Sequence, residues 1–263
     1  MTTVADVLNF LETVAPVHMK CEWDRVGLNC GHLAGEVKTV LVALDPFMDV
    51  CKEAKDLNAD LLLTHHPLIW NAGFVTDETV QGQNTLFLIE NNIAHINAHT
   101  NLDCAPGGVN DCLAGALGLS DVSVIEPVGT DSQGRDYGLL RQGSVSRQSL
   151  SDFLKLVKDS LGCTGLRYTD AGKGVEKVAV GGGACGSELQ QAVRAGCDTF
   201  VTADVKYNQF RDAFDLGLNL IDAGHFHTEN PVCAYLSREL SEAFPKITVL
   251  RSRCNTDCAK FFP

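Results

Sequence analysis

Three short segments, far apart in the chain, carry residue types that bind metal ions. They are residues 64–67 (Thr-His-His-Pro), 99–103 (His-Thr-Asn-Leu-Asp) and 225–229 (His-Phe-His-Thr-Glu), and they hold five of the eight histidines. Imidazole together with carboxylate is a ligand set that accepts Zn, Mn, Fe or Ni. The residue types therefore indicate a metal site.

Each segment follows an apolar run that is typical of a buried strand, namely residues 60–63, 93–98 and 218–223. In α/β proteins, binding sites collect at the carboxyl ends of strands. If the three strand ends meet, they bring several imidazoles and two carboxylates to one point. That is the ligand set of a two-metal centre.

The first two segments each have a second interpretation. Neighbouring strand residues point to opposite faces, so His65 and His66 can serve one centre only where the strand ends and the chain turns. They then suit two neighbouring ions, one each, and the alternative is one buried histidine bonded to the backbone beside an exposed one. For His99 and Asp103, placed at a strand end and in the loop after it, the alternative is a helix cap or a turn aspartate.

The third segment begins after Gly224, which frees the backbone at a strand end. Thr228 is expected to cap the last helix and Glu229 to open it. A glutamate in a first helical turn is stabilised by the helix dipole, but it could equally bridge two cations. His227 is open to three roles: a metal ligand, a donor to a ligand, or a substrate contact.

Composition excludes several classes of protein. The chain of 263 residues has 45% hydrophobic and 21% charged residues with a net charge of −12, and it has no basic run. Duplex nucleic acid and membrane surfaces are therefore not expected as partners. No apolar stretch reaches the roughly 20 residues that span a bilayer, and the first residues lack the pattern of a signal peptide.

A cytoplasmic location follows as the expectation, with the eleven cysteines reduced. Most of them fit apolar helix or strand patterns and are interpreted as small core residues. Cys254 and Cys258 form a lone CxxxC, which lacks the second pair that zinc sites of this kind need.

The alternation of strand-like and helix-like segments predicts an α/β fold with mixed sheets. Asp45-Pro46 is interpreted as a helix start with proline in the first turn, and the polar turn 131–135 as a candidate boundary. The predicted helices are 3–14, a helix from 45, 84–91, 109–117, 150–161 and 231–240. The predicted strands are 37–44, 60–63, 93–98, 137–143, 177–181, 199–202 and 218–223.

Residues 181–186 (Gly-Gly-Gly-Ala-Cys-Gly) fit the pattern GxGxxG between a predicted strand and a predicted helix. An NAD-binding loop is one interpretation, with Asp204 at a suitable distance along the chain. A glycine-rich turn that accepts a phosphate or packs the second half of the chain is the preferred one.

At these positions the chain resembles the GTP cyclohydrolase I type 2 family, also known as the NGG-interacting-factor-three-like family of dinuclear metal proteins. The resemblance runs along nearly the whole chain. It rests on the following segments: Trp-Asp-Arg-Val-Gly-Leu at 23–28, Val-Ala-Leu-Asp at 42–45, Leu-Thr-His-His-Pro-Leu at 63–68, His-Thr-Asn-Leu-Asp at 99–103, and Gly-His to Glu at 224–229.

The resemblance implies a ligand set for two divalent ions per subunit: His65, His66, His99, Asp103, His225 and Glu229. Asp103 and Glu229 would be the bridging groups. It also implies the short form of the family, which assembles as a ring-shaped homohexamer. Each subunit would have a first α/β lobe (1–128), a second lobe (129–222) and a return segment (223–263) that completes the metal site in the first lobe.

One segment departs from the family pattern. The family has Thr-Gly followed by an acidic residue, often with a histidine nearby, whereas residues 202–208 read Thr-Ala-Asp-Val-Lys-Tyr-Asn. Ala203 replaces the glycine, and Asn208 lies where histidine is common. Asp204 and Tyr207 are still expected to line the site.

Two functions are expected from different classes. The first is a metal-dependent hydrolase in which two ions acidify a water and polarise the bond under attack, with Glu229, His227 and Asp204 as candidate catalytic residues. His227 or Asp204 would move the proton. The family label specifies opening of the guanine ring of GTP with loss of formate; a phosphoester or a cyclic amide suits the metals equally.

The second function is a non-enzymatic ring protein that serves as an adaptor, a regulator or a metal-handling protein, with structural metals. A nucleotide-binding oxidoreductase that uses residues 181–186 is the third alternative.

Overall fold

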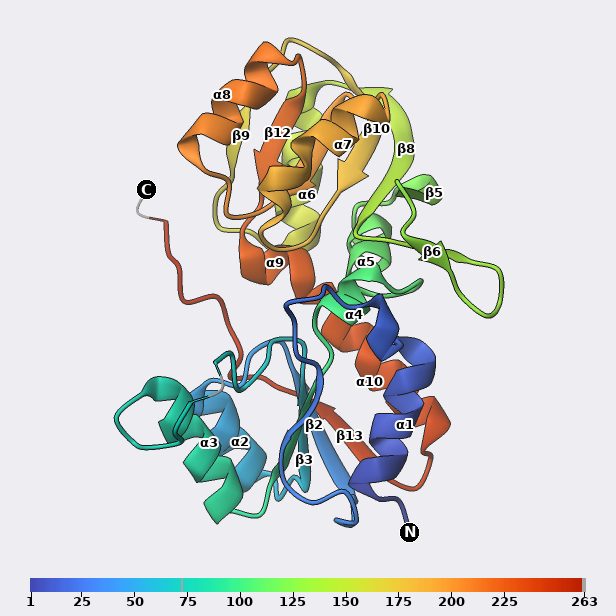
Figure 1. Ribbon diagram of the computed structural model, residues 1–263. Coiled ribbons are helices and arrows are strands. Elements are labelled where there is room, and N and C mark those ends of the chain that lie inside the picture. The colour runs from blue at the N-terminus through green and yellow to red at the C-terminus, as the bar shows by residue number, and fades with distance from the viewer. Residues whose placement is uncertain (72, 262–263) are drawn as a thin grey trace. The chain divides into compact units, whose positions relative to one another are not determined.

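The computed structural model describes residues 1–71 and 73–261, which form two compact α/β units (Figure 1). The first unit is Met1–Ala105 with Cys233–Thr256, and the second is Pro106–Val232 with Asp257–Pro263. The expected α/β class with mixed sheets is confirmed. Within the described part of the chain, no helix is both long enough and apolar enough to span a membrane.

The first unit is built on a five-stranded sheet in the order β1-β4-β3-β2-β13. All neighbours are parallel except β1, which runs antiparallel to β4. The strands are β1 (Gly27–Cys30), β2 (Thr39–Ala43), β3 (Leu61–Thr64), β4 (Ala94–Asn97) and β13 (Thr248–Arg251). The continuous apolar sequence of β2 and β3 suits central parallel strands, which are buried on both faces.

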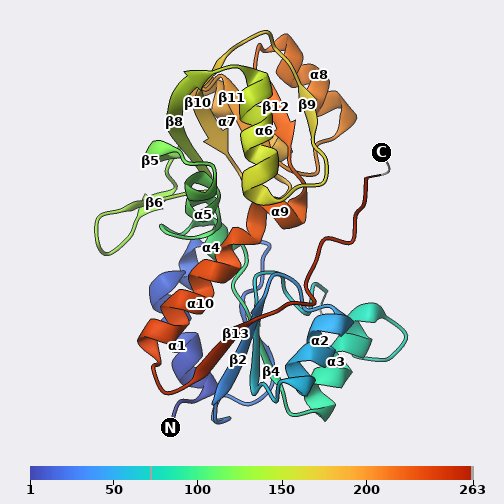
Figure 2. The same cartoon turned by 180° about the vertical axis from the view of Figure 1, so that it is seen from behind.

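Helices cover both faces of this sheet. α2 and α3 lie on one side, and α1 and α10 on the other, as Figure 1 shows and Figure 2 shows from behind. The helices of this unit are α1 (Val4–Val14), the 3₁₀ turn η1 (Val17–Met19), α2 (Met48–Asp56), α3 (Val80–Glu90), α4 (Thr100–Cys104) and most of α10 (Pro231–Ala243).

The second unit has a six-stranded sheet in the order β5-β8-β10-β11-β12-β9 and a small hairpin. β10, β11 and β12 are parallel, and the other three strands are antiparallel to their neighbours. The strands are β5 (Ser120–Ile125), β8 (Leu140–Gln148), β9 (Arg167–Thr169), β10 (Val175–Val180), β11 (Thr199–Thr202) and β12 (Asn219–Asp222), with β6 (Gly129–Thr130) and β7 (Asp136–Tyr137) in the hairpin.

Two apolar cores lie on the two faces of that sheet. One includes Phe153 and Val157 of α6, and the other includes Leu189 of α7 and Ala213 of α8. The helices of this unit are α5 (Val109–Ala116), α6 (Leu150–Leu161), the 3₁₀ turn η2 (Cys185–Glu188), α7 (Leu189–Arg194), α8 (Tyr207–Asp215) and α9 (His225–Glu229). The helix predicted at 150–161 is confirmed with its Ser149 cap, because the Ser149 hydroxyl accepts from the Asp152 amide.

Several predicted boundaries are wrong. α2 begins at Met48 and not at Pro46, because Asp45 bonds to other segments and caps nothing. α3 begins four residues early, at Val80, since Thr79 caps the amide of Gly82. The strand expected at 137–143 is two strands, β7 and β8, and the turn 131–135 joins the hairpin inside the second unit.

Candidate functional site

In the first unit, the parallel pairing of β3 with β4 sets Thr64 opposite Asn97. The chain therefore leaves both strands at the same edge of the sheet, with His65 and His66 after β3 and His99 after β4. Ligand atoms of these three histidines lie within 4.8 Å of one another. The meeting of the first two segments at strand ends, expected from the sequence, is confirmed.

Each of the three imidazoles is held through its Nδ1 atom by an oxygen. The Nδ1 of His65 lies 2.8 Å from the Ala98 carbonyl, and that of His66 lies 2.7 Å from Oδ1 of Asp45. The Nδ1 of His99 lies 3.0 Å from Oδ2 of Asp24. A carbonyl or carboxylate only accepts, so the hydrogen-bonded Nδ1 atoms of His65 and His66 carry the proton and their Nε2 atoms carry the lone pair.

Metal-binding histidines are usually oriented in this way, with the second ring nitrogen donating to a carboxylate or a backbone carbonyl. The two carboxylates are themselves held. Asp45 accepts from the side chain of Asn255 at 3.0 Å, and Asp24 accepts from the hydroxyl and the amide of Thr100 at 2.6 and 3.0 Å. The rings are thus fixed before any ligand arrives.

Asp24 is ionised in this setting. Burial opposes its charge, but hydrogen bonds from His99 and Thr100 hold the pKa of its carboxyl well below the usual range.

Neither Asp24 nor Asp45 was singled out as a site residue from the sequence. The signal was present, because both lie in the segments at 23–28 and 42–45 that carry the family resemblance.

Asp103 lies on α4, a helix of five residues, and not in a loop as the sequence suggested. His99 is the residue before the first turn of this helix, and Asp103 follows four positions later. This places Oδ1 of Asp103 3.5 Å from Nε2 of His65. The first unit therefore gathers three imidazoles and one carboxylate.

The second unit forms its own cluster where β10, β11 and β12 end. His225 and Glu229 belong to α9, a separate short helix, so the expectation that Thr228 caps the last helix and Glu229 opens it is wrong. The Nε2 of His225 lies 3.1 Å from Oε2 of Glu229, and its Nδ1 lies 2.7 Å from Oδ2 of Asp204. His225 is oriented by a carboxylate, as His66 and His99 are.

Thr228 holds α9 in place through its hydroxyl. It donates within its own helix, toward the carbonyls of Gly224 and His225, and it accepts from the amide of Gly183 at 3.0 Å. The amide of Gly182 donates to Asn110 at 2.7 Å. Two amides of the glycine-rich loop are therefore used inside this unit, which favours the packing interpretation over a dinucleotide-binding loop.

His227 faces other partners. Its Nδ1 lies 3.1 Å from the Leu161 carbonyl, and its Nε2 lies 3.3 Å from Oδ2 of Asp257. No cluster of metal-ligand side chains among residues 1–71 and 73–261 includes His227. Tyr207, at the start of α8, is 91% exposed.

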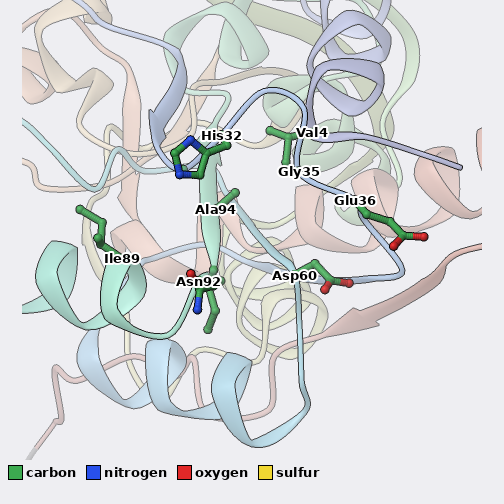
Figure 3. A pocket seen from close by; sticks show the side chains of 10 residues that line it. Val4, His32, Gly35, Glu36, Asp60, Ile89, Asn92 and Ala94 are labelled. Atoms are coloured by element: carbon green, nitrogen blue, oxygen red, sulfur yellow. The ribbon is translucent and has the colours of Figure 1, made fainter.

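Two pockets of the first unit differ in their relation to these residues. The one in Figure 3, of about 430 Å³, is lined by His32, Asp60 and Ala94 among others, at the amino ends of β3 and β4. None of the candidate ligands lines it. The other, of about 370 Å³, is lined by Asp45, His66 and Trp70, so it borders the histidine cluster.

Comparison with known proteins gives a consistent result. A family model described as Duf34/NIF3 (NGG1p interacting factor 3) matches residues 2–258. A Clostridium perfringens protein named GTP cyclohydrolase 1 type 2 homolog is 35% identical over 240 residues, which cover 90% of each chain. A Streptomyces coelicolor protein of the same name is 36% identical and covers 92% of this chain and 87% of its own.

The fold also matches solved structures. A Bacillus cereus protein described as related to NIF3 superposes with a TM-score of 0.93 at 26% identity, over 100% of this chain and 99% of that one.

Proposed function

Because the chain belongs to the Duf34/NIF3 family, we propose that it is a metal-dependent hydrolase that acts on a nucleotide or a related small molecule. The proposed ligands are His65, His66, His99 and Asp103 of the first unit and His225 and Glu229 of the second. They would serve one centre with two divalent ions, completed by the return segment 223–263. The divisions at 128/129 and 222/223 are part of the same proposal.

The observation that carries this proposal is the shared orientation of four histidines. His65, His66, His99 and His225 each have Nδ1 at an oxygen acceptor, and each therefore presents Nε2. Core histidines need no such common arrangement. It is the arrangement that fixes ring tautomer and raises ligand basicity at metal sites.

The donor set suits Zn, Mn, Fe or Ni, since imidazole and carboxylate are hard-to-borderline ligands. Bound divalent ions would polarise the substrate and make a water molecule more acidic. The chain supplies the rest. Asp24, Asp45 and Asp204 hold three of the imidazoles in one tautomer, and Asp103 and Glu229 contribute the negative charge that divalent ions require.

We propose Glu229, His227 and Asp204 as the residues that handle protons, with Asp204 acting through His225. Asp204 has a φ of 51°, an unusual value for a residue other than glycine. Its carboxylate is directed at Nδ1 of His225 and orients that imidazole. The remaining expectations, GTP as the substrate, a homohexamer and a cytoplasmic location, belong to the proposal.

The first experiment measures metal content per subunit in untagged protein and in the variants His66→Ala and Glu229→Ala. Each variant should bind metal at least tenfold more weakly while its fold stays intact. His32→Ala is the matched control, because His32 is an exposed histidine of the first unit outside the clusters. Full occupancy in both ligand variants contradicts the assignment.

The second experiment assays formate release from GTP on the same samples. Metal-dependent turnover that falls with metal content supports the hydrolase. Stoichiometric metal without turnover on GTP, on phosphoesters or on cyclic amides contradicts it and favours a metal-binding adaptor.

A further inference from the structure

The pocket beside His66 has the features of a site for a flat ring. Its volume of about 370 Å³ is within the range of small-molecule sites. Most of its lining is apolar, with Phe47, Leu68 and Val80 among the residues, and His66 and Asp45 also line it. A molecule in this pocket therefore lies against a proposed metal ligand.

Trp70 forms part of the wall and is held in place. Its ring packs edge-on against His99, with centroids 5.3 Å apart, and lies 6.2 Å from the ring of His66. Its backbone amide donates to Oε1 of Gln81 at 2.8 Å. The indole is nevertheless 53% exposed, so a large apolar surface is positioned rigidly but left uncovered.

Asn84 also lines this pocket, and its side chain has an unmet polar atom. It is 5% exposed, and its side-chain nitrogen donates to the carbonyl of Pro46 at 3.0 Å. That contact fixes the amide orientation, since a carbonyl cannot donate. Its Oδ1 has no hydrogen-bond partner among residues 1–71 and 73–261, and a buried acceptor of this kind costs about 1 to 3 kcal/mol unless something donates to it.

We propose that this pocket binds the heteroaromatic ring of the substrate, stacked on Trp70, with a ring N–H or amino group donated to Asn84. This inference rests on the proposed function and names the substrate class of that site. Every purine or pteridine-like ring has a π-face to stack, and an amino-substituted ring such as guanine also has an edge that donates, whereas a phosphate has no face to stack. The edge of such a ring would lie beside His66.

The chain offers a direct test, because Trp23 and Trp70 are its only two tryptophans. In Trp23→Phe, Trp70 is the sole indole, and guanosine should quench its fluorescence in a saturable manner. Ribose 5-phosphate and inorganic triphosphate should not. This binding is measured with and without added metal, so that it is independent of metal occupancy and turnover.

Calorimetry with guanosine then compares two matched variants. Trp23 is 68% exposed and also packs edge-on against His99, at 5.9 Å, but it is not among the residues that line this pocket. Trp70→Leu should weaken guanosine binding at least tenfold, with Trp70→Phe restoring most of it. Trp23→Leu should change it less than twofold, and metal content should stay constant in all three.

Asn84→Leu should also weaken the binding of guanosine at least tenfold. It should weaken the binding of purine riboside, which lacks the donating groups on the ring, much less. Equal effects of Trp70→Leu and Trp23→Leu would overturn the proposal, as would the absence of saturable quenching. A loss of metal in Trp70→Leu that matches its loss of guanosine would assign Trp70 to the metal site instead. If the wild type binds guanosine but no metal, the proposed hydrolase function is refuted and the proposed ring-binding pocket is not.

Discussion

The contact between Gly183 and Glu229 allows a sharp test of the second cluster. Gly183 has a φ of +65°, and a methyl group at its Cα would lie 2.2 Å from Oε1 of Glu229 and 3.1 Å from Nε2 of His225. The replacement Gly183→Ala therefore inserts an atom where the proposed ligands lie. Glu229 is buried, so its carboxylate can move aside only by disturbing its neighbours.

The expected cost has two parts. A left-handed backbone costs a residue with a Cβ about 1 to 2 kcal/mol, and the overlap adds about 1 to 3 kcal/mol. Gly162→Ala isolates the first part. Gly162 has a φ of +69° at the end of α6 in the same unit, and no atom lies within 4 Å of its hypothetical Cβ.

The assay is urea unfolding of both variants together with metal titration. Gly183→Ala should lower the free energy of unfolding by at least 1 kcal/mol more than Gly162→Ala does. Of the two variants, only Gly183→Ala should bind metal at least tenfold more weakly. Equal destabilisation of the two variants would refute the overlap. Unchanged metal affinity in Gly183→Ala would refute the placement of Glu229 as a ligand.

Two further predictions concern buried charge. Burial lowers the pKa of His95 to about 3, below its unfolded value near 6.5, so the unfolded state binds the extra proton and stability falls as pH drops from 6.5 toward 3. The neutral His95 should thus lower the free energy of unfolding by about 2 kcal/mol at pH 5. In His95→Gln, the free energy of unfolding measured with urea should fall by about 2 kcal/mol less between pH 7 and pH 5 than in the wild type. An equally steep fall in the variant would contradict this. Asp111 bonds to the buried guanidinium of Arg141 at 3.0 Å through both oxygens, so Asp111→Ala should cost about 3 kcal/mol, whereas Asp215→Ala at an exposed ion pair should cost under about 1 kcal/mol. Similar losses in the two variants, measured by urea unfolding, would show that burial of the pair is unimportant.

Short-range sequence patterns were sufficient to predict much of the fold. The amphipathic spacing of residues 150–161 and the serine before them predicted α6 at its observed bounds. The apolar run before His65 predicted β3, since continuous hydrophobic sequence is typical of a central parallel strand, and the strand-like residues before His99 predicted β4. Their histidines could be placed at strand ends for the same reason.

Boundaries and caps were less predictable, because they depend on partners distant in sequence. Asp45 was expected to begin a helix, but it bonds to His66 and to Asn255, 210 residues further on. Thr228 was expected to cap a helix that it does not begin, since its hydroxyl is engaged by α9 and by Gly183. Edge strands such as β1 and β13 were missed, because their sequences have no continuous apolar run.

The sequence by itself determined which residue types could hold a metal and that they follow strands, because these are properties of composition and of local periodicity. Only the tertiary structure decided how each imidazole is oriented. The carboxylate that holds His99 is Asp24, 75 positions earlier in the chain, and the carbonyl that holds His65 belongs to the end of the neighbouring strand. Local propensity does not encode such contacts, because they form only when β3 and β4 pair and the chain before them folds against their ends.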